Sequence, residues 1–122
     1  MTHSAASPAQ ISDPSLSAID MEHLLHYTMG DKALAREVLG LFSTQGRIYL
    51  EQLDQTRDPK QRKASAHTLK GSARGVGAHH VAELAEVLEA LSATPDDAEW
   101  TGALEALKSA FDEAITCVAN LD

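Results

Sequence analysis

The chain has 122 residues and a formal net charge of −8 at pH 7, with 43% hydrophobic but only 4% aromatic residues. This length suffices for one domain with one core, and the apolar content excludes a disordered chain. Few aromatic residues predict a core of Leu, Val, Ile and Ala, which is typical of helical bundles, and the acidic balance argues against nucleic acid as a general partner.

The first half of the chain predicts a leader and two helices. Residues 1–13 are rich in Ala, Ser and Pro, so we expect a flexible leader there and a domain over residues 14–122. A short helix is expected over residues 20–29, stopped by Gly30, with two of Met21, Leu25 and Met29 in the core. A long helix is expected over residues 32–57, with this apolar stripe: Leu34, Val38, Leu41, Phe42, Ile48, Tyr49 and Leu53.

The second half predicts three more helices. Asp58 and Pro59 are typical of a helix start, and this third helix is expected to end near residues 75–77. The next helix is expected over residues 78–93, with Glu89 facing outward or sideways. Thr94 and Asp97 then resemble a capping box in which Asp replaces Glu. The last helix carries an apolar stripe: Trp100, Leu104, Leu107, Phe111, Ile115 and Val118.

No segment alternates with the period of two that a strand requires. The sequence therefore predicts an all-α fold, an antiparallel up-and-down four-helix bundle with a short additional N-terminal helix.

The helix after Asp58 sorts into two faces. An apolar stripe faces the core, formed by Ser65, Leu69, Ala73 and Val76, and His67 points the other way. Beside His67 run the cations Lys60, Lys63, Lys70 and Arg74. With Arg62 they make five of the chain's ten Lys and Arg residues, so an acidic chain has concentrated positive charge on one helix.

Two small residues, Ala64 and Gly71, flank His67 on the exposed face. Glycine inside a helix lowers helix stability by about 0.5–1 kcal/mol relative to alanine, so helix formation alone does not explain Gly71. Steric clearance for another molecule is one reason. A helix nearing its end is the other, and it explains Gly75 and Gly77 better than Gly71.

An exposed neutral imidazole beside cations can attack phosphorus as a nucleophile, and the cations then lie near the phosphoryl group it acquires. Each exposed cation contributes only about 0.2–1 kcal/mol. The cations therefore position the phosphoryl group, and the catalysis of its transfer must come from elsewhere.

The stretch His67-Thr68-Leu69-Lys70-Gly71-Ser72-Ala73-Arg74-Gly75-Val76-Gly77-Ala78 resembles the signature of histidine-containing phosphotransfer (Hpt) domains. That signature reads His-x-Leu-Lys-Gly-Ser-(Ser/Ala), then three residues ending in an aliphatic, then Gly-Ala. The resemblance extends over the chain from about Asp20. It combines a reactive residue, a cation and a small residue at fixed spacing, and is therefore specific.

The resemblance implies a phosphocarrier in a two-component phosphorelay. His67 is the expected phosphoacceptor on its outward ring nitrogen, Lys70 holds charge near the phosphoryl group, Ala64 and Gly71 permit approach, and Lys63 and Arg74 orient the partner. The expected partners are receiver domains of response regulators and a hybrid or sensor histidine kinase. The receiver supplies the aspartate, Mg²⁺ and lysine of the transfer machinery, and no cofactor is expected on this chain.

The sequence has no Gly-rich phosphate loop and no kinase signature, so we expect a transfer intermediate and not an enzyme. The competing hypothesis is a non-phosphorylated helical adaptor that binds a receiver or kinase with the same face. A small nucleic-acid-binding bundle is a third hypothesis, which the net charge opposes.

The sequence also allows predictions about membrane spans, cellular location and metal binding. No apolar run approaches the roughly 20 residues that cross a bilayer. The single cysteine, Cys117, cannot form an internal disulfide and is expected in the core, so a cytoplasmic location is predicted. The protein is expected to be a monomer. No metal site is expected, because the adjacent side chains of His79 and His80 diverge. A free-standing module is favoured over a fragment of a hybrid kinase or a relative of the chemotaxis-kinase domain.

Overall fold

The computed structural model describes residues 18–119, which form helices and, within that range, no strand. The helices are α3 (Met21–Tyr27), α4 (Lys32–Gln55), α5 (Pro59–Val76), α6 (His79–Ala90) and α7 (Asp97–Ala119). The all-α prediction is confirmed. The expected leader over residues 1–13 lies outside the described residues.

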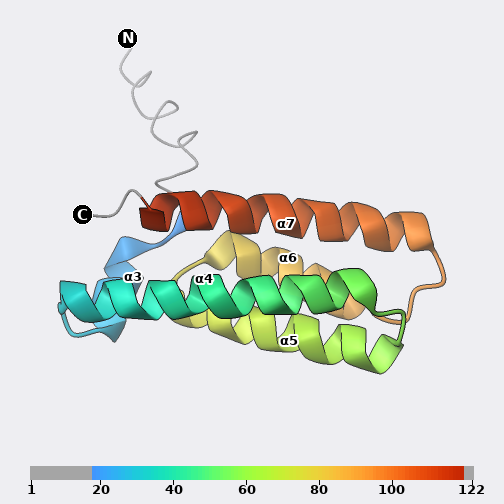
Figure 1. The fold of residues 1–122 in the computed structure, drawn as a ribbon, viewed down its shortest axis with the longest axis horizontal. Coiled ribbons are helices and arrows are strands. Elements are labelled where there is room, and N and C mark those ends of the chain that lie inside the picture. The colour runs from blue at the N-terminus through green and yellow to red at the C-terminus, as the bar shows by residue number, and fades with distance from the viewer. Residues whose placement is uncertain (1–17, 120–122) are drawn as a thin grey trace, which may run out of the picture.

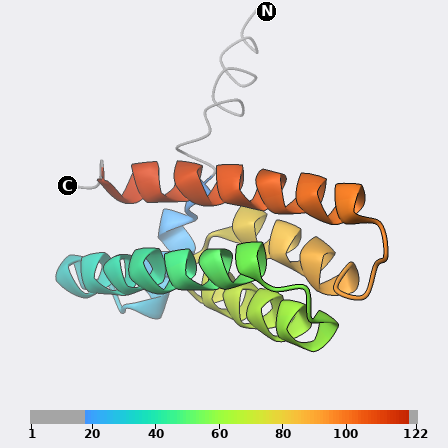
Figure 2. The same ribbon diagram turned by 45° about the vertical axis from the view of Figure 1, so that its right-hand side comes forward.

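The four longer helices form an antiparallel bundle (Figures 1 and 2). Helix α4 packs on α5, α5 on α6, α6 on α7, and α7 returns to α4, so α4 and α6 lie at opposite corners. Short α3 lies at one end of the bundle against α4 and α5. The predicted up-and-down topology with a short additional helix is therefore confirmed.

Aspartates cap four of the five described helices, all except α6, because their carboxylates accept hydrogen bonds from the unpaired N–H groups of the first turn. Asp20 accepts from the His23 N–H at 3.0 Å and Asp58 from the Lys60 N–H at 3.1 Å. The predicted capping box of Thr94 and Asp97 is wrong: Asp96 accepts from the Glu99 N–H at 3.0 Å. The Thr94 hydroxyl accepts from the Asp96 N–H at 3.2 Å, so it orients the cap of α7 from outside the helix.

The core face of α4 differs from the predicted stripe. Leu34, Leu41 and Ile48 are exposed, and the helix buries the set Ala35, Leu39, Phe42, Gly46, Leu50 and Leu53. Phe42 and Leu53 of the predicted stripe are buried, and Val38 and Tyr49 pack partly buried on the core. The prediction is therefore wrong only for Leu34, Leu41 and Ile48. A β-carbon at Gly46 would overlap the ring of Phe111, so this glycine allows α7 to approach closely.

The remaining core agrees with the sequence. Trp100, Leu104, Leu107 and Phe111 of α7 are buried, and Ile115 and Val118 pack partly buried against them. Met21 and Leu25 of α3 pack on the core while Met29 is exposed, which confirms that two of the three are core residues. Cys117 is half-buried against the same core.

Candidate functional site

His67 lies near the middle of α5, with 67% of its side chain exposed. Its Nδ1 atom is 3.0 Å from Oε2 of Glu89 on α6. The other ring nitrogen, Nε2, makes no hydrogen bond to any described residue. One ring nitrogen is thus held by a neighbouring helix and the other faces outward.

Glu89 is shared between His67 and Lys70. The Lys70 ammonium donates to Oε1 of Glu89 at 2.7 Å, and the side chains of Lys70 and Glu89 are only 13% and 18% exposed. The hydrogen bond from Lys70 holds the pKa of Glu89 below its usual value; partial burial opposes this shift and the contact with His67 adds to it. Glu89 therefore stays ionised at neutral pH.

An ionised carboxylate can only accept hydrogen bonds, and this fixes the tautomer of the neutral imidazole. The proton of His67 resides on Nδ1, where it is donated to Glu89, and the lone pair resides on Nε2. The geometry therefore presents an exposed, oriented nucleophilic nitrogen. The contact of Glu89 with His67 was not predicted, because it depends on the register between α5 and α6 and no short-range sequence pattern reports that register.

A shallow depression of about 400 Å³ lies beside the imidazole, lined by Lys60, Lys63, Ala64, His67 and Glu89. Of the predicted docking residues, Lys63 and Ala64 therefore border His67 directly. Both are exposed, and Lys63 forms no ion pair with a described residue. The depression is shallow and open to solvent.

Gly71 is exposed one turn after His67, and a β-carbon there would meet nothing within 4 Å. Helix α5 continues to Val76, so Gly71 is not at the helix end. Neither internal packing nor helix termination explains the glycine.

The predicted basic stripe is partly neutralised by α6. Arg74 lies 3.6 Å from Glu86, both side chains being exposed, and Lys70 is paired with Glu89 as described. Arg62, counted among the basic residues of this helix, does not belong to the surface. It is buried over the ring of Trp100, with the guanidinium carbon 4.1 Å from the ring centroid.

The Gly-Ala pair that ends the signature joins α5 to α3. Gly77 closes α5 with a φ of 83°, and its carbonyl accepts from the Asp20 N–H at 2.8 Å. A β-carbon on Gly77 would lie 2.8 Å from the Asp20 carbonyl oxygen, and Ala78 is fully buried. Glycine is thus required here by backbone conformation and by contact.

The other histidines of the described range do not gather around His67. His79 Nε2 lies 3.1 Å from Asp20 Oδ2, and His80 Nδ1 lies 3.6 Å from Glu83. Between residues 18 and 119, no three His, Cys, Asp or Glu side chains are grouped to hold a metal ion. None of the helices described has the length and apolar character to span a membrane.

The sequence matches the family model of the Hpt domain over residues 37–116, which is more than half of the chain. The chain belongs to the Hpt domain family, and its role is histidine phosphotransfer in phosphorelays, that of a carrier domain rather than a catalytic enzyme domain. The match begins within α4, so residues 20–36 lie outside it. No curated protein and no solved structure matches the chain.

Proposed function

We propose that this chain is the phosphocarrier of a multistep phosphorelay and that His67 shuttles the phosphoryl group between receiver-domain aspartates. The observation that carries the proposal is the imidazole itself, with Nδ1 bound to Glu89, Nε2 bonded to no described residue, and Lys70 held on the same Glu89 carboxylate. The Nε2 lone pair attacks phosphorus, and the bond from phosphorus to the aspartyl oxygen breaks. The electron pair leaves with the aspartate carboxylate, while the proton on Nδ1 stays in place.

Glu89 and Lys70 have complementary roles in this step. The imidazole gains positive charge as the phosphorus–nitrogen bond forms, and Glu89 stabilises that charge through Nδ1. Lys70 is held next to the ring by the same carboxylate and supplies positive charge near the phosphoryl oxygens. The receiver domain brings the Mg²⁺ and lysine that stabilise the transferring group, so this chain needs no metal or nucleotide of its own.

The docking face is proposed to extend from α5 onto α4. Gln52 of α4 accepts from the Ser65 hydroxyl of α5 at 3.1 Å, which places this side of α4 against α5. Ile48 lies one turn before Gln52 and Leu41 two turns before Ile48, so helical spacing places both exposed apolar residues on the α5 side of α4. A receiver surface covers this stripe while Ala64 and Gly71 allow close approach and Lys63 and Arg74 contact its acidic rim.

We further propose a cytoplasmic monomer whose phosphoryl groups come from a hybrid or sensor histidine kinase by way of a receiver domain. The single cysteine and the need to meet receiver domains support the location. The monomer leaves the apolar stripe on α4 free for the receiver.

The experiment is phosphotransfer from a phosphorylated receiver domain to the wild type, His67→Gln and the matched control His80→Gln. His80 is an exposed histidine on the adjacent helix. The wild type and His80→Gln are expected to acquire an acid-labile label, whereas His67→Gln binds the receiver without label. If all three proteins bind a panel of receivers and none is labelled, the adaptor replaces the carrier.

Docking is tested separately by measuring receiver affinity. Ile48→Glu places a charge in the apolar stripe and is expected to weaken binding about tenfold or more. Val87→Glu, at an exposed apolar position on α6, is the matched control and keeps wild-type affinity. Equal affinities for both variants would remove α4 from the docking face.

A further inference from the structure

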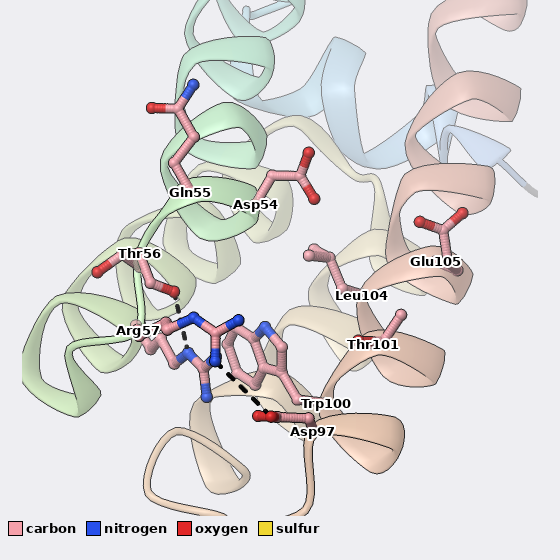
Figure 3. A pocket seen from close by; sticks show the side chains of 10 residues that line it. Asp54, Gln55, Thr56, Arg57, Asp97, Trp100, Thr101, Leu104 and Glu105 are labelled. Carbon is pink, nitrogen blue, oxygen red and sulfur yellow. Dashed lines mark hydrogen bonds and ion pairs between the residues drawn. The ribbon is translucent and has the colours of Figure 1, made fainter.

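A second pocket lies at the end of the bundle where α4 ends and α5 and α7 begin. It measures about 170 Å³ and is formed by the ends of these helices and the connection after α4. Figure 3 shows Trp100 and Leu104 of α7 in its wall, with Thr56 and Arg57 on the α4–α5 connection. None of these residues lines the depression beside His67.

Arg62 contributes a buried charge without a counterion to this pocket. The residue is only 7% exposed, and its Nε donates to the Thr56 carbonyl at 3.3 Å. Its other contact is with the face of Trp100. The two terminal nitrogens bond to no described residue, and no carboxylate of the described range forms an ion pair with them. In the described range no side-chain nitrogen sealed from solvent lacks a partner, so these two terminal nitrogens are open to the pocket. A planar anion that accepts two parallel hydrogen bonds, above all a carboxylate, matches them there.

Three carboxylates line the pocket: Asp97, which pairs with Arg57 at 3.7 Å, and Asp54 and Glu105. Figure 3 shows Asp54 and Glu105 at a distance from Arg57 and Trp100, across the space that the lining residues enclose. Lys108 pairs with both carboxylates, at 2.9 Å from Asp54 and 3.4 Å from Glu105, so one positive charge offsets two negative charges. Simple anions are repelled by this rim, whereas a ligand that also carries an ammonium group is attracted.

We propose that this pocket binds a small zwitterion, a free α-amino acid. Its carboxylate lies on the terminal nitrogens of Arg62, its ammonium group faces Asp54 and Glu105, and an aliphatic side chain contacts Trp100 and Leu104. The pocket volume admits a single small molecule of this kind and no peptide. This pocket is separate from the depression beside His67, so its test does not depend on the phosphocarrier function.

The test is a titration of the full chain with L-leucine, followed by the fluorescence of the single tryptophan and by the Arg62 Nε–H resonance. Two analogues of leucine test its charged groups separately: 4-methylpentanoate lacks the ammonium group and 3-methylbutylamine lacks the carboxylate. We expect saturable binding of L-leucine at about millimolar concentration, and each probe at least about tenfold weaker. Absence of saturation with L-leucine, or equal binding of either probe, would overturn the proposal.

Variants locate the site. Arg62→Lys keeps the charge but loses the planar fork, and Asp54→Asn removes a rim charge; each is expected to weaken L-leucine binding about tenfold. Arg36→Gln, an exposed cation elsewhere on α4, is the control with unchanged affinity. Asp54 is exposed and dispensable for the core, so Asp54→Asn decides the question if Arg62→Lys fails to fold. Unchanged affinity in a folded Arg62→Lys or in Asp54→Asn would refute the site.

Discussion

Oε2 of Glu89 lies 3.0 Å from Nδ1 of His67, so a carboxylate on α6 orients the exposed imidazole of α5. The same carboxylate accepts from Lys70 at 2.7 Å. This contact engages Nδ1 and leaves Nε2, the nitrogen proposed to carry the phosphoryl group, without a bond to a described residue.

Glu89→Gln tests the orienting contact. A neutral amide stabilises the positive charge on the phosphorylated ring less well and cannot fix the tautomer as a carboxylate does. We expect the rate of phosphotransfer from a saturating receiver domain to fall about tenfold to a hundredfold with receiver affinity nearly unchanged. Glu86→Gln, on the same helix, is the control, and single-turnover kinetics provide the rates. Wild-type rates in Glu89→Gln would show that Glu89 does not orient the ring.

Stability in acid depends on the same carboxylate. Because the pKa of Glu89 is lower in the folded chain than its ordinary 4.5, the unfolded chain binds the proton more readily. The contribution of Glu89 to the free energy of unfolding is thus fully present well above pH 4.5, and it is lost as the pH falls through 4.5 towards the lowered pKa. Urea unfolding between about pH 3 and 7 measures this effect. We expect the free energy of unfolding to decrease less steeply with falling pH in Glu89→Gln than in the wild type. Parallel curves for the two proteins would contradict this linkage.

Gly71→Ala separates stability from function. The added methyl group meets open space, so the free energy of unfolding is expected to rise by about 0.5–1 kcal/mol while phosphotransfer slows about tenfold or more. Gly102→Ala, at an equally open position inside α7, is expected to give the same stabilisation with normal transfer. Thermal unfolding and transfer rates measure both effects. Normal transfer in Gly71→Ala would show that clearance at this position is not needed.

Gly77→Ala is expected to destabilise the fold by about 1–3 kcal/mol, because φ is 83° and the methyl group would press on the Asp20 carbonyl. Gly75→Ala, two residues earlier in α5 and with free space around it, is the matched comparison and is expected to be neutral or stabilising. Chemical denaturation of both variants gives the difference. Equal stabilities would mean that the junction between α3 and α5 relaxes without cost.

Much of this structure could be predicted from the sequence because its signals are local. Asp58 and Pro59 mark the start of α5, Gly77 marks its end, and the spacing around His67 separates an exposed from a buried face. The failures concern packing between helices. The pattern of α4 could not show that Gly46 admits Phe111, so Leu41 and Ile48 were wrongly placed in the core.

The same limit applies to the site. His67 and Gly71 could be found within one signature, whereas Glu89 reaches His67 only through the register of two antiparallel helices. Arg62 was grouped with the basic residues because its position in the sequence does not reveal that Trp100, from the far end of the chain, covers it.

The most direct test of the carrier is to locate the phosphoryl group after transfer from a receiver domain. Peptide mapping identifies the modified residue among the six histidines, and ¹H–¹⁵N NMR of the phosphorylated chain identifies the ring nitrogen. Our account predicts a single phosphohistidine at His67, on Nε2, with the proton still on Nδ1 next to Glu89. A phosphoryl group on Nδ1 of His67 would contradict the proposed geometry, and one on another histidine would contradict the assignment of His67 as the carrier residue.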